Sequence, residues 1–142
     1  MSFKERSALL MAGSLVLVYG AYFCVVVRWL QVAPASEVAY QPLLIVATIP
    51  LVILAVVGHA VLALFSWGEL REAAVDDERD RLITIRSERI GGLVLSLGIA
   101  GGLVLAMFSV EHFFIANALL LIWVLAEIAE ASTRVVLYRR GT

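Results

Sequence analysis

Five polar residues interrupt the long apolar stretches of this chain, and their types could support chemistry inside a membrane. A histidine and a carboxylate can share a proton, pair as ions or bind a cation together. Ionisable groups in a membrane interior are costly, so they commonly mark a pathway, a relay or a paired contact. The candidate cluster consists of His59, Asn117, Glu127, Glu130 and Arg134.

The spacing along the chain predicts how members of this cluster meet. Glu127 lies seven residues before Arg134, and His59 lies at the same distance from the end of its own apolar stretch. At 1.5 Å per residue each would sit ~10 Å from the same end of its helix, so we expect His59 and Glu127 at one depth. Glu130 can pair with Arg134 at the favourable spacing of four residues, or with Arg89.

Three hypotheses stay open for the cluster. Its members can form a fully paired network of hydrogen bonds and salt bridges that fixes the helix register. Glu127 with His59 can instead handle a proton or a cation. His59, Glu127 and Glu130 can also supply ligands for zinc or manganese, but no local motif such as HExxH accompanies them. We therefore expect no metal site and no cofactor.

Motifs of enzymes and of nucleic-acid-binding proteins are missing from the sequence. It contains no recognisable pairing of a nucleophile with a base, no phosphate-binding loop and no nucleic-acid-binding module. Cys24 is its single cysteine, so these 142 residues hold no disulfide. We expect a protein that is not an enzyme and does not bind nucleic acid.

Composition places the cluster in a membrane. Hydrophobic residues make up 62% of the chain and charged residues 16%, whereas soluble domains average roughly 45–50% and about 25%. Four stretches are long enough to cross a bilayer, which takes ~20 apolar residues each. We predict one all-α domain of four transmembrane helices, at residues 8–30, 41–65, 93–110 and 113–136, with a charged connector at 66–92. Residues 8–30 are too long for the core of a signal peptide, so we expect a retained helix.

The positions of lysine and arginine predict the orientation. With four spans, both termini and the connector lie on one side, and that side holds ten of the eleven Lys and Arg residues. The positive-inside rule then places both termini and the connector in the cytoplasm. On the other side a small ring of charged residues is expected from Arg28, Glu37, Glu111 and His112.

The connector carries the only sizeable charged surface. Between Glu69 and Ile90 it has no Gly or Pro and is rich in helix-forming residues. We therefore expect the second and third helices to extend into the cytoplasm as a helical hairpin that turns near residues 75–77. The apolar residues Leu82, Ile83, Ile85 and Ile90 would pack on the other arm of that hairpin or on lipid headgroups. Four of its five arginines are the candidate surface for a protein partner: Arg79, Arg81, Arg86 and Arg89.

Small residues predict where the helices touch, because helices in lipid pack closely through small side chains. Gly91, Gly98 and Gly102 share one face of the third span and include a GxxxG pair. This face can pack inside one bundle or against a second copy in a homo-oligomer. A weaker stripe of Gly13, Gly20 and Cys24 lies on the first span.

The fourth span has a packing stripe of its own. Polar and apolar residues recur there at spacings of three and four, so this stripe should face other helices and not lipid. Its members are Asn117, Leu120, Val124, Glu127, Ala131 and Arg134.

Three blocks resemble a known kind of protein: DERDRLITIRSERIGG at residues 77–92, HFFIANALLLIWVLAE at 112–127 and LYRRG at 137–141. They are similar to small four-helix membrane proteins of bacteria and archaea that form a family of unknown function. The resemblance implies a cytoplasmic membrane location and the four-helix topology, but it assigns no catalytic residues. It also implies a sensing or signalling accessory, because genes of such families lie near small helix-turn-helix regulators.

Two functions are expected from these observations. The first is a non-enzymatic membrane protein, a sensor, regulator or accessory subunit, that docks a partner through the charged connector. The alternative is a small oligomeric transporter coupled to protons, in which Glu127 acts with His59. Four-helix carriers of that kind place their essential acid in the first helix, and here the first span has none.

Overall fold

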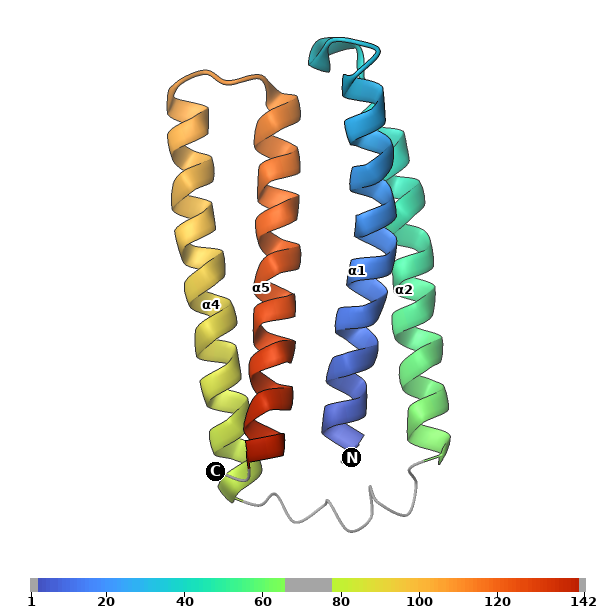
Figure 1. Cartoon of the computed structure of the whole chain (residues 1–142), viewed down its shortest axis with the longest axis vertical. Helices are drawn as coiled ribbons and strands as arrows, with labels where there is room; N and C mark the ends of the chain where they lie inside the picture. Colours follow the sequence, from blue (N-terminus) through green and yellow to red (C-terminus); the bar gives the residue numbers. More distant parts are fainter. Residues whose placement is uncertain (1–2, 66–77, 141–142) are drawn as a thin grey trace.

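The computed structural model describes residues 3–65 and 78–140 of the chain, and these fold into helices without a strand. The long helices are α1 (Phe3–Leu30), α2 (Tyr40–Phe65), α4 (Glu78–Met107) and α5 (His112–Arg140), with a short 3-10 turn η1 (Ala35–Glu37) between α1 and α2 (Figure 1). By length and composition all four can cross a membrane. The prediction of an all-α protein with four such helices is confirmed.

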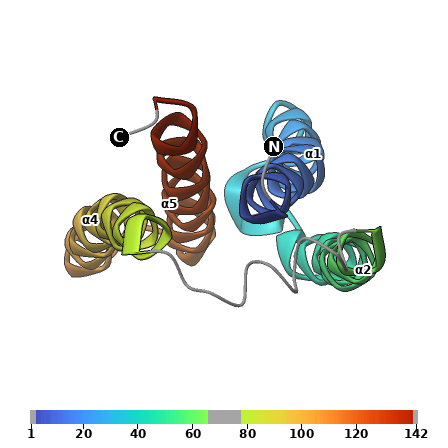
Figure 2. The ribbon, with the colours of Figure 1, turned by 90° about the horizontal axis from the view of Figure 1, so that it is seen from below.

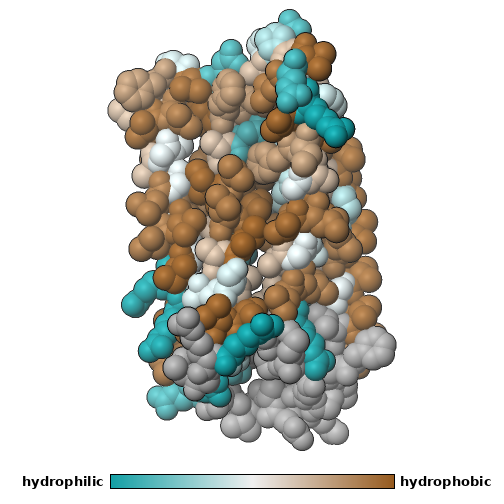
Figure 3. All heavy atoms as spheres, viewed as in Figure 1, coloured by the Kyte–Doolittle hydropathy of each residue, from teal (hydrophilic) through white to brown (hydrophobic). Residues whose placement is uncertain are grey.

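The helices form two antiparallel hairpins, α1–α2 and α4–α5, that join through α1 and α5. The extensive contacts are α4 on α5, α5 on α1, and α1 on α2. Helices α2 and α4 therefore flank an inner pair, and the start of α1 lies at the same end as the end of α5 (Figures 1 and 2). Apolar side chains cover the middle of the visible face and hydrophilic ones gather towards its ends (Figure 3).

The core lies where α1, α2 and α5 meet. Leu15 and Tyr19 of α1 are buried there together with Leu51 of α2 and Val124 of α5. The ring of Tyr19 stands edge-on to that of Trp123, with 5.8 Å between centroids, an arrangement that aromatic pairs favour. Aromatic side chains of α1 and α5 thus pack against each other in this core.

The contact between α4 and α5 depends on the predicted glycines. A Cβ atom added to Gly98 would overlap the side chain of Ile122, and one added to Gly102 would lie 2.5 Å from Leu119 Cδ2. The glycine face of α4 is therefore used inside the molecule. By contrast, nothing lies within 4 Å of a Cβ added to Gly13 or Gly20, so the weaker stripe on α1 makes no close helix contact among the described residues.

The predicted hairpin of the second and third helices requires a correction. Its turn at residues 75–77 lies outside the described residues, but α2 and α4 stand at opposite edges of the molecule (Figure 2). Helix α4 does begin well before its apolar part, at Glu78, and there it packs on α5. Ile83 is buried, whereas Leu82 and Ile85 are 49% and 43% exposed. Helix α4 packs on α5 and not on α2 because its glycine face, Gly91, Gly98 and Gly102, lies against side chains of α5.

A Schellman motif closes α4 before the short turn to α5. The Val110 N–H donates to the Leu105 carbonyl, and the Ser109 N–H donates to that of Ala106. Ser109 has a φ of 53°, the left-handed conformation that this position requires and that glycine adopts most easily.

A first prediction tests the close contact of α4 with α5. Gly98→Ala should lower the free energy of unfolding by about 1–3 kcal/mol, because the new methyl group overlaps Ile122. Gly101→Ala is the matched control: it lies on an open face and should gain up to about 1 kcal/mol from helix propensity. SDS titration of the purified protein in micelles, followed by circular dichroism, measures both. Equal stability of the two variants would contradict the close contact.

A second prediction concerns the end of α4. Ser109→Gly should raise the free energy of unfolding by about 0.5–1 kcal/mol, because glycine adopts the left-handed conformation without strain. Ser96→Gly, on the exposed face within α4, should instead lose roughly 0.5 kcal/mol. The same titration distinguishes the two. A loss of stability in Ser109→Gly would show that the serine side chain has another role there.

Candidate functional site

The structure distributes four of the five predicted cluster residues over the three helix interfaces. His59 contacts α1, Asn117 joins α5 to α1, and Glu130 with Arg134 joins α5 to α4. Each interface thus has its own polar contact, and the single cluster predicted from the sequence is divided.

His59 is bound on both ring nitrogens. Nδ1 lies 2.6 Å from the carbonyl oxygen of Ala55, and Nε2 lies 2.8 Å from Ser7 Oγ. A carbonyl only accepts, so in the neutral ring Nδ1 carries the proton and Nε2 accepts the serine hydroxyl proton. His59 therefore ties α2 to α1, and its hydrogen-bonding capacity is used.

The predicted meeting of His59 with Glu127 is not seen, and the helix register explains why. The hydrogen bond between Tyr22 and Asn117 places these two residues at the same height. Ser7 lies fifteen residues before Tyr22 on α1. Because α5 runs antiparallel to α1, the residue of α5 at the height of Ser7 is about fifteen residues after Asn117, near residue 132. Glu127 is five residues higher, which is ~7.5 Å at 1.5 Å per residue. Helix α5 also continues beyond Arg134 to Arg140, so Glu127 lies farther from the end of its helix than the count from Arg134 predicts.

The contact between the two hairpins is a buried hydrogen bond. The Tyr22 hydroxyl donates to Asn117 Oδ1 over 2.8 Å, and Asn117 Nδ2 donates to the Phe113 carbonyl over 2.8 Å. Both side chains are buried. The amide is thus used on both sides, and it holds α5 at one height against α1.

The lower part of α4 and α5 is joined by an ion pair and a serine. Arg134 Nη2 lies 2.6 Å from Glu130 Oε1, and Arg134 Nε donates to Ser87 Oγ over 3.3 Å. Ser87 is fully buried and donates in turn to the Thr84 carbonyl. A Cβ added to Gly91 would meet Glu130 Oε2 at 3.1 Å, so glycine leaves room for the carboxylate. Glu130 pairs with Arg134, not with Arg89.

Glu127 takes part in none of these contacts. It is half-buried and falls on the stripe of α5 that carries Asn117 and Val124. No member of that predicted stripe is exposed: Asn117, Leu120, Val124, Glu127, Ala131 and Arg134 are each buried or half-buried.

Four of the five arginines of the connector lie in the described part of the chain and form a basic face on α4. All of them are exposed, while Ile83, Ser87 and Gly91 on the other side of the helix are buried. The basic face is defined as Arg79, Arg81, Arg86 and Arg89.

Sequence reasoning missed three partners in these contacts. They are Ser7 for His59, Tyr22 for Asn117, and Ser87 as the hydrogen-bond acceptor for Arg134. Ser87 carried a usable signal, because it stands four residues before Gly91 on the glycine face. Ser7 and Tyr22 carried none, because their partners depend on how the hairpins meet.

The chemistry of these sites is that of helix positioning. No group of three or more His, Cys, Asp or Glu side chains in the described ranges could hold a metal ion. Comparisons of the chain with protein-family models, with curated proteins and with solved structures find no match.

A third prediction tests the link between the hairpins. Tyr22→Phe should lower the free energy of unfolding by about 1 kcal/mol, because Asn117 loses its buried donor. Tyr19→Phe is the control, since its hydroxyl lies a long 3.5 Å from Thr48 Oγ1, and it should cost less. Unfolding in micelles measures the difference. An equal loss in both variants would show that the Tyr22 bond adds nothing to the contact.

Proposed function

We propose that the protein is a non-enzymatic subunit of a bacterial or archaeal cytoplasmic membrane, a sensor, regulator or accessory component, that docks an acidic protein partner on its basic face. The observation that carries the proposal is the exposure of Arg79, Arg81, Arg86 and Arg89 on a helix whose opposite side is closed by α5.

The composition of this face supports a protein partner. Arg79 and Arg86 stand two turns apart, and the exposed apolar side chains of Leu82 and Ile85 lie between them in the sequence. Arginines around exposed apolar side chains are typical of interfaces with acidic partners. Residues 78–89 also carry Glu78, Asp80 and Glu88, of which Glu78 and Glu88 are exposed, so the four arginines outnumber the three acids.

The orientation belongs to the same proposal. With four spans, the sequence assigns ten of the eleven Lys and Arg residues to the side of both termini, which by the positive-inside rule is the cytoplasm. The basic face then meets cytoplasmic proteins.

The alternative, a small oligomeric proton-coupled transporter, has weaker support. It relies on Glu127 acting with His59, but His59 is bound to Ser7 and Ala55 on the far side of α1. Proton-coupled uptake into vesicles that is lost in Glu127→Gln would favour the transporter over the docking subunit.

A fourth prediction tests docking by photo-crosslinking in living cells. A photoreactive amino acid at Ile85, beside the arginines, should capture one defined protein with an acidic surface, and the same residue at Leu97, on the exposed apolar part of α4, should not. Arg79→Glu with Arg86→Glu should abolish the crosslink, because the charges then repel the partner.

Arg28→Glu, an exposed arginine at the other end of the molecule, serves as the matched control and should leave the crosslink intact. Membrane levels and unfolding of each variant are checked in parallel. A crosslink that survives the double reversal, or that is lost equally in Arg28→Glu, contradicts the proposal.

A further inference from the structure

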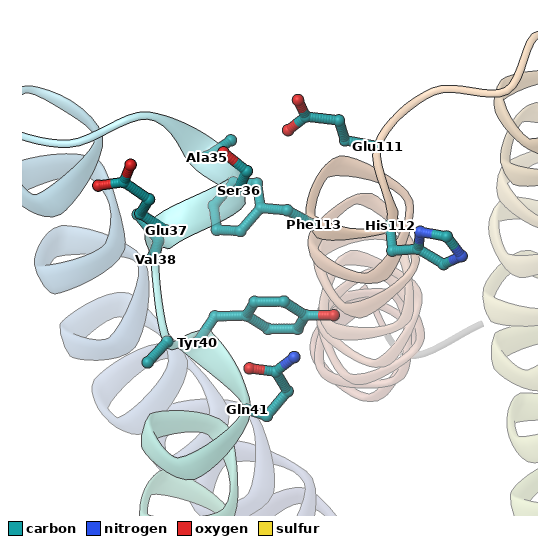
Figure 4. Close-up of a pocket in the computed structure, with 10 residues that line it drawn as sticks. Ala35, Ser36, Glu37, Val38, Tyr40, Gln41, Glu111, His112 and Phe113 are labelled. Carbon is teal, nitrogen blue, oxygen red and sulfur yellow. The ribbon is translucent and has the colours of Figure 1, made fainter.

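A cavity of about 460 Å³ lies at the end of the molecule opposite to the basic face. It is formed between the η1 turn and the start of α5, so each hairpin supplies part of its wall (Figure 4). Cavities that hold small organic ligands are typically about 300–1,000 Å³. We call this space the η1 cavity.

The wall of the η1 cavity combines carboxylates with aromatic rings. Glu111 extends its carboxylate toward the η1 turn, whereas Glu37, which also lines the cavity, directs its carboxylate away from Glu111 (Figure 4). Tyr40 and Phe113 form an aromatic side, edge to face with 5.3 Å between their centroids. Gln41 adds an amide. His112 is the one basic residue of the lining, and its ring extends away from the η1 turn (Figure 4).

The aromatic side of the cavity is part of the folded core. Phe113 is buried and belongs to the same apolar cluster as Val38, which follows η1. The η1 turn itself packs on α5. The shape of the cavity is therefore held by contacts between the hairpins, and ligand binding requires no new helix packing.

We propose that the η1 cavity binds a small organic ammonium ion. The Glu111 carboxylate at the mouth of the cavity, with Glu37 farther off on the same lining, attracts positive charge, and the half-buried ring of Tyr40 can attract an ammonium group through its π face. The volume exceeds that of a bare metal ion, and the described residues offer no three-ligand metal group. This inference is independent of the proposed docking, because it concerns the other end of the molecule.

Calorimetric titration in an uncharged maltoside detergent tests it, with choline chloride as the probe. Choline should bind saturably to one site per chain, and its uncharged analogue, in which carbon replaces nitrogen, should bind at least about tenfold more weakly. Glu37→Gln with Glu111→Gln should weaken choline binding by about tenfold or more, because both attracting charges are lost.

Glu78→Gln with Glu88→Gln is the matched control: it removes two exposed acids from the other end and should leave choline binding unchanged. Glu37 and Glu111 are exposed, so their variants should keep the wild-type unfolding midpoint. The proposal is overturned if choline does not bind, if the uncharged analogue binds equally well, or if the cavity double variant binds like the control. Displacement of choline by equimolar magnesium would overturn it as well, since the site would then favour an inorganic ion.

Discussion

The buried bond from Tyr22 to Asn117, set among aromatic rings, is the contact on which the arrangement of the two hairpins depends. Each hairpin is held together by a short connection along the chain, but α1 on α5 is the extensive contact between them. In lipid, apolar surface alone gives helices little reason to associate. A polar pair that must be satisfied therefore fixes which heights on α1 and α5 are matched.

That register has consequences at both ends of the molecule. At one end it brings the η1 turn over Phe113, which creates the η1 cavity. Toward the other end it places Ser7 and His59 level with residues near 132, so His59 is offset from Glu127. The two features that sequence spacing could connect to function, a His–Glu pair and an outer charged ring, are thus both governed by one interface.

The other interfaces use different means of close approach. Helix α4 meets α5 through Gly91, Gly98 and Gly102, whereas α2 meets α1 where Gly58 faces Leu10. Among the described helices, α4 makes an extensive contact only with α5, so its other side is exposed. This geometry, not a special property of the arginines, is what makes the basic face available to a partner.

The sequence by itself determined the helices and the glycine face, and it offered Arg134 as one of two partners for Glu130, because hydropathy, small residues and the four-residue spacing are local properties of a helix. Hydropathy also located the helix ends to within a few residues, except that α1 begins early at Phe3, α4 begins early at Glu78 and α5 continues to Arg140. Only the tertiary structure decided that α4 pairs with α5, that His59 pairs with Ser7, and that Tyr22 reaches Asn117. Those contacts depend on the relative height and order of helices that are distant in sequence, and no periodicity within one helix records either quantity.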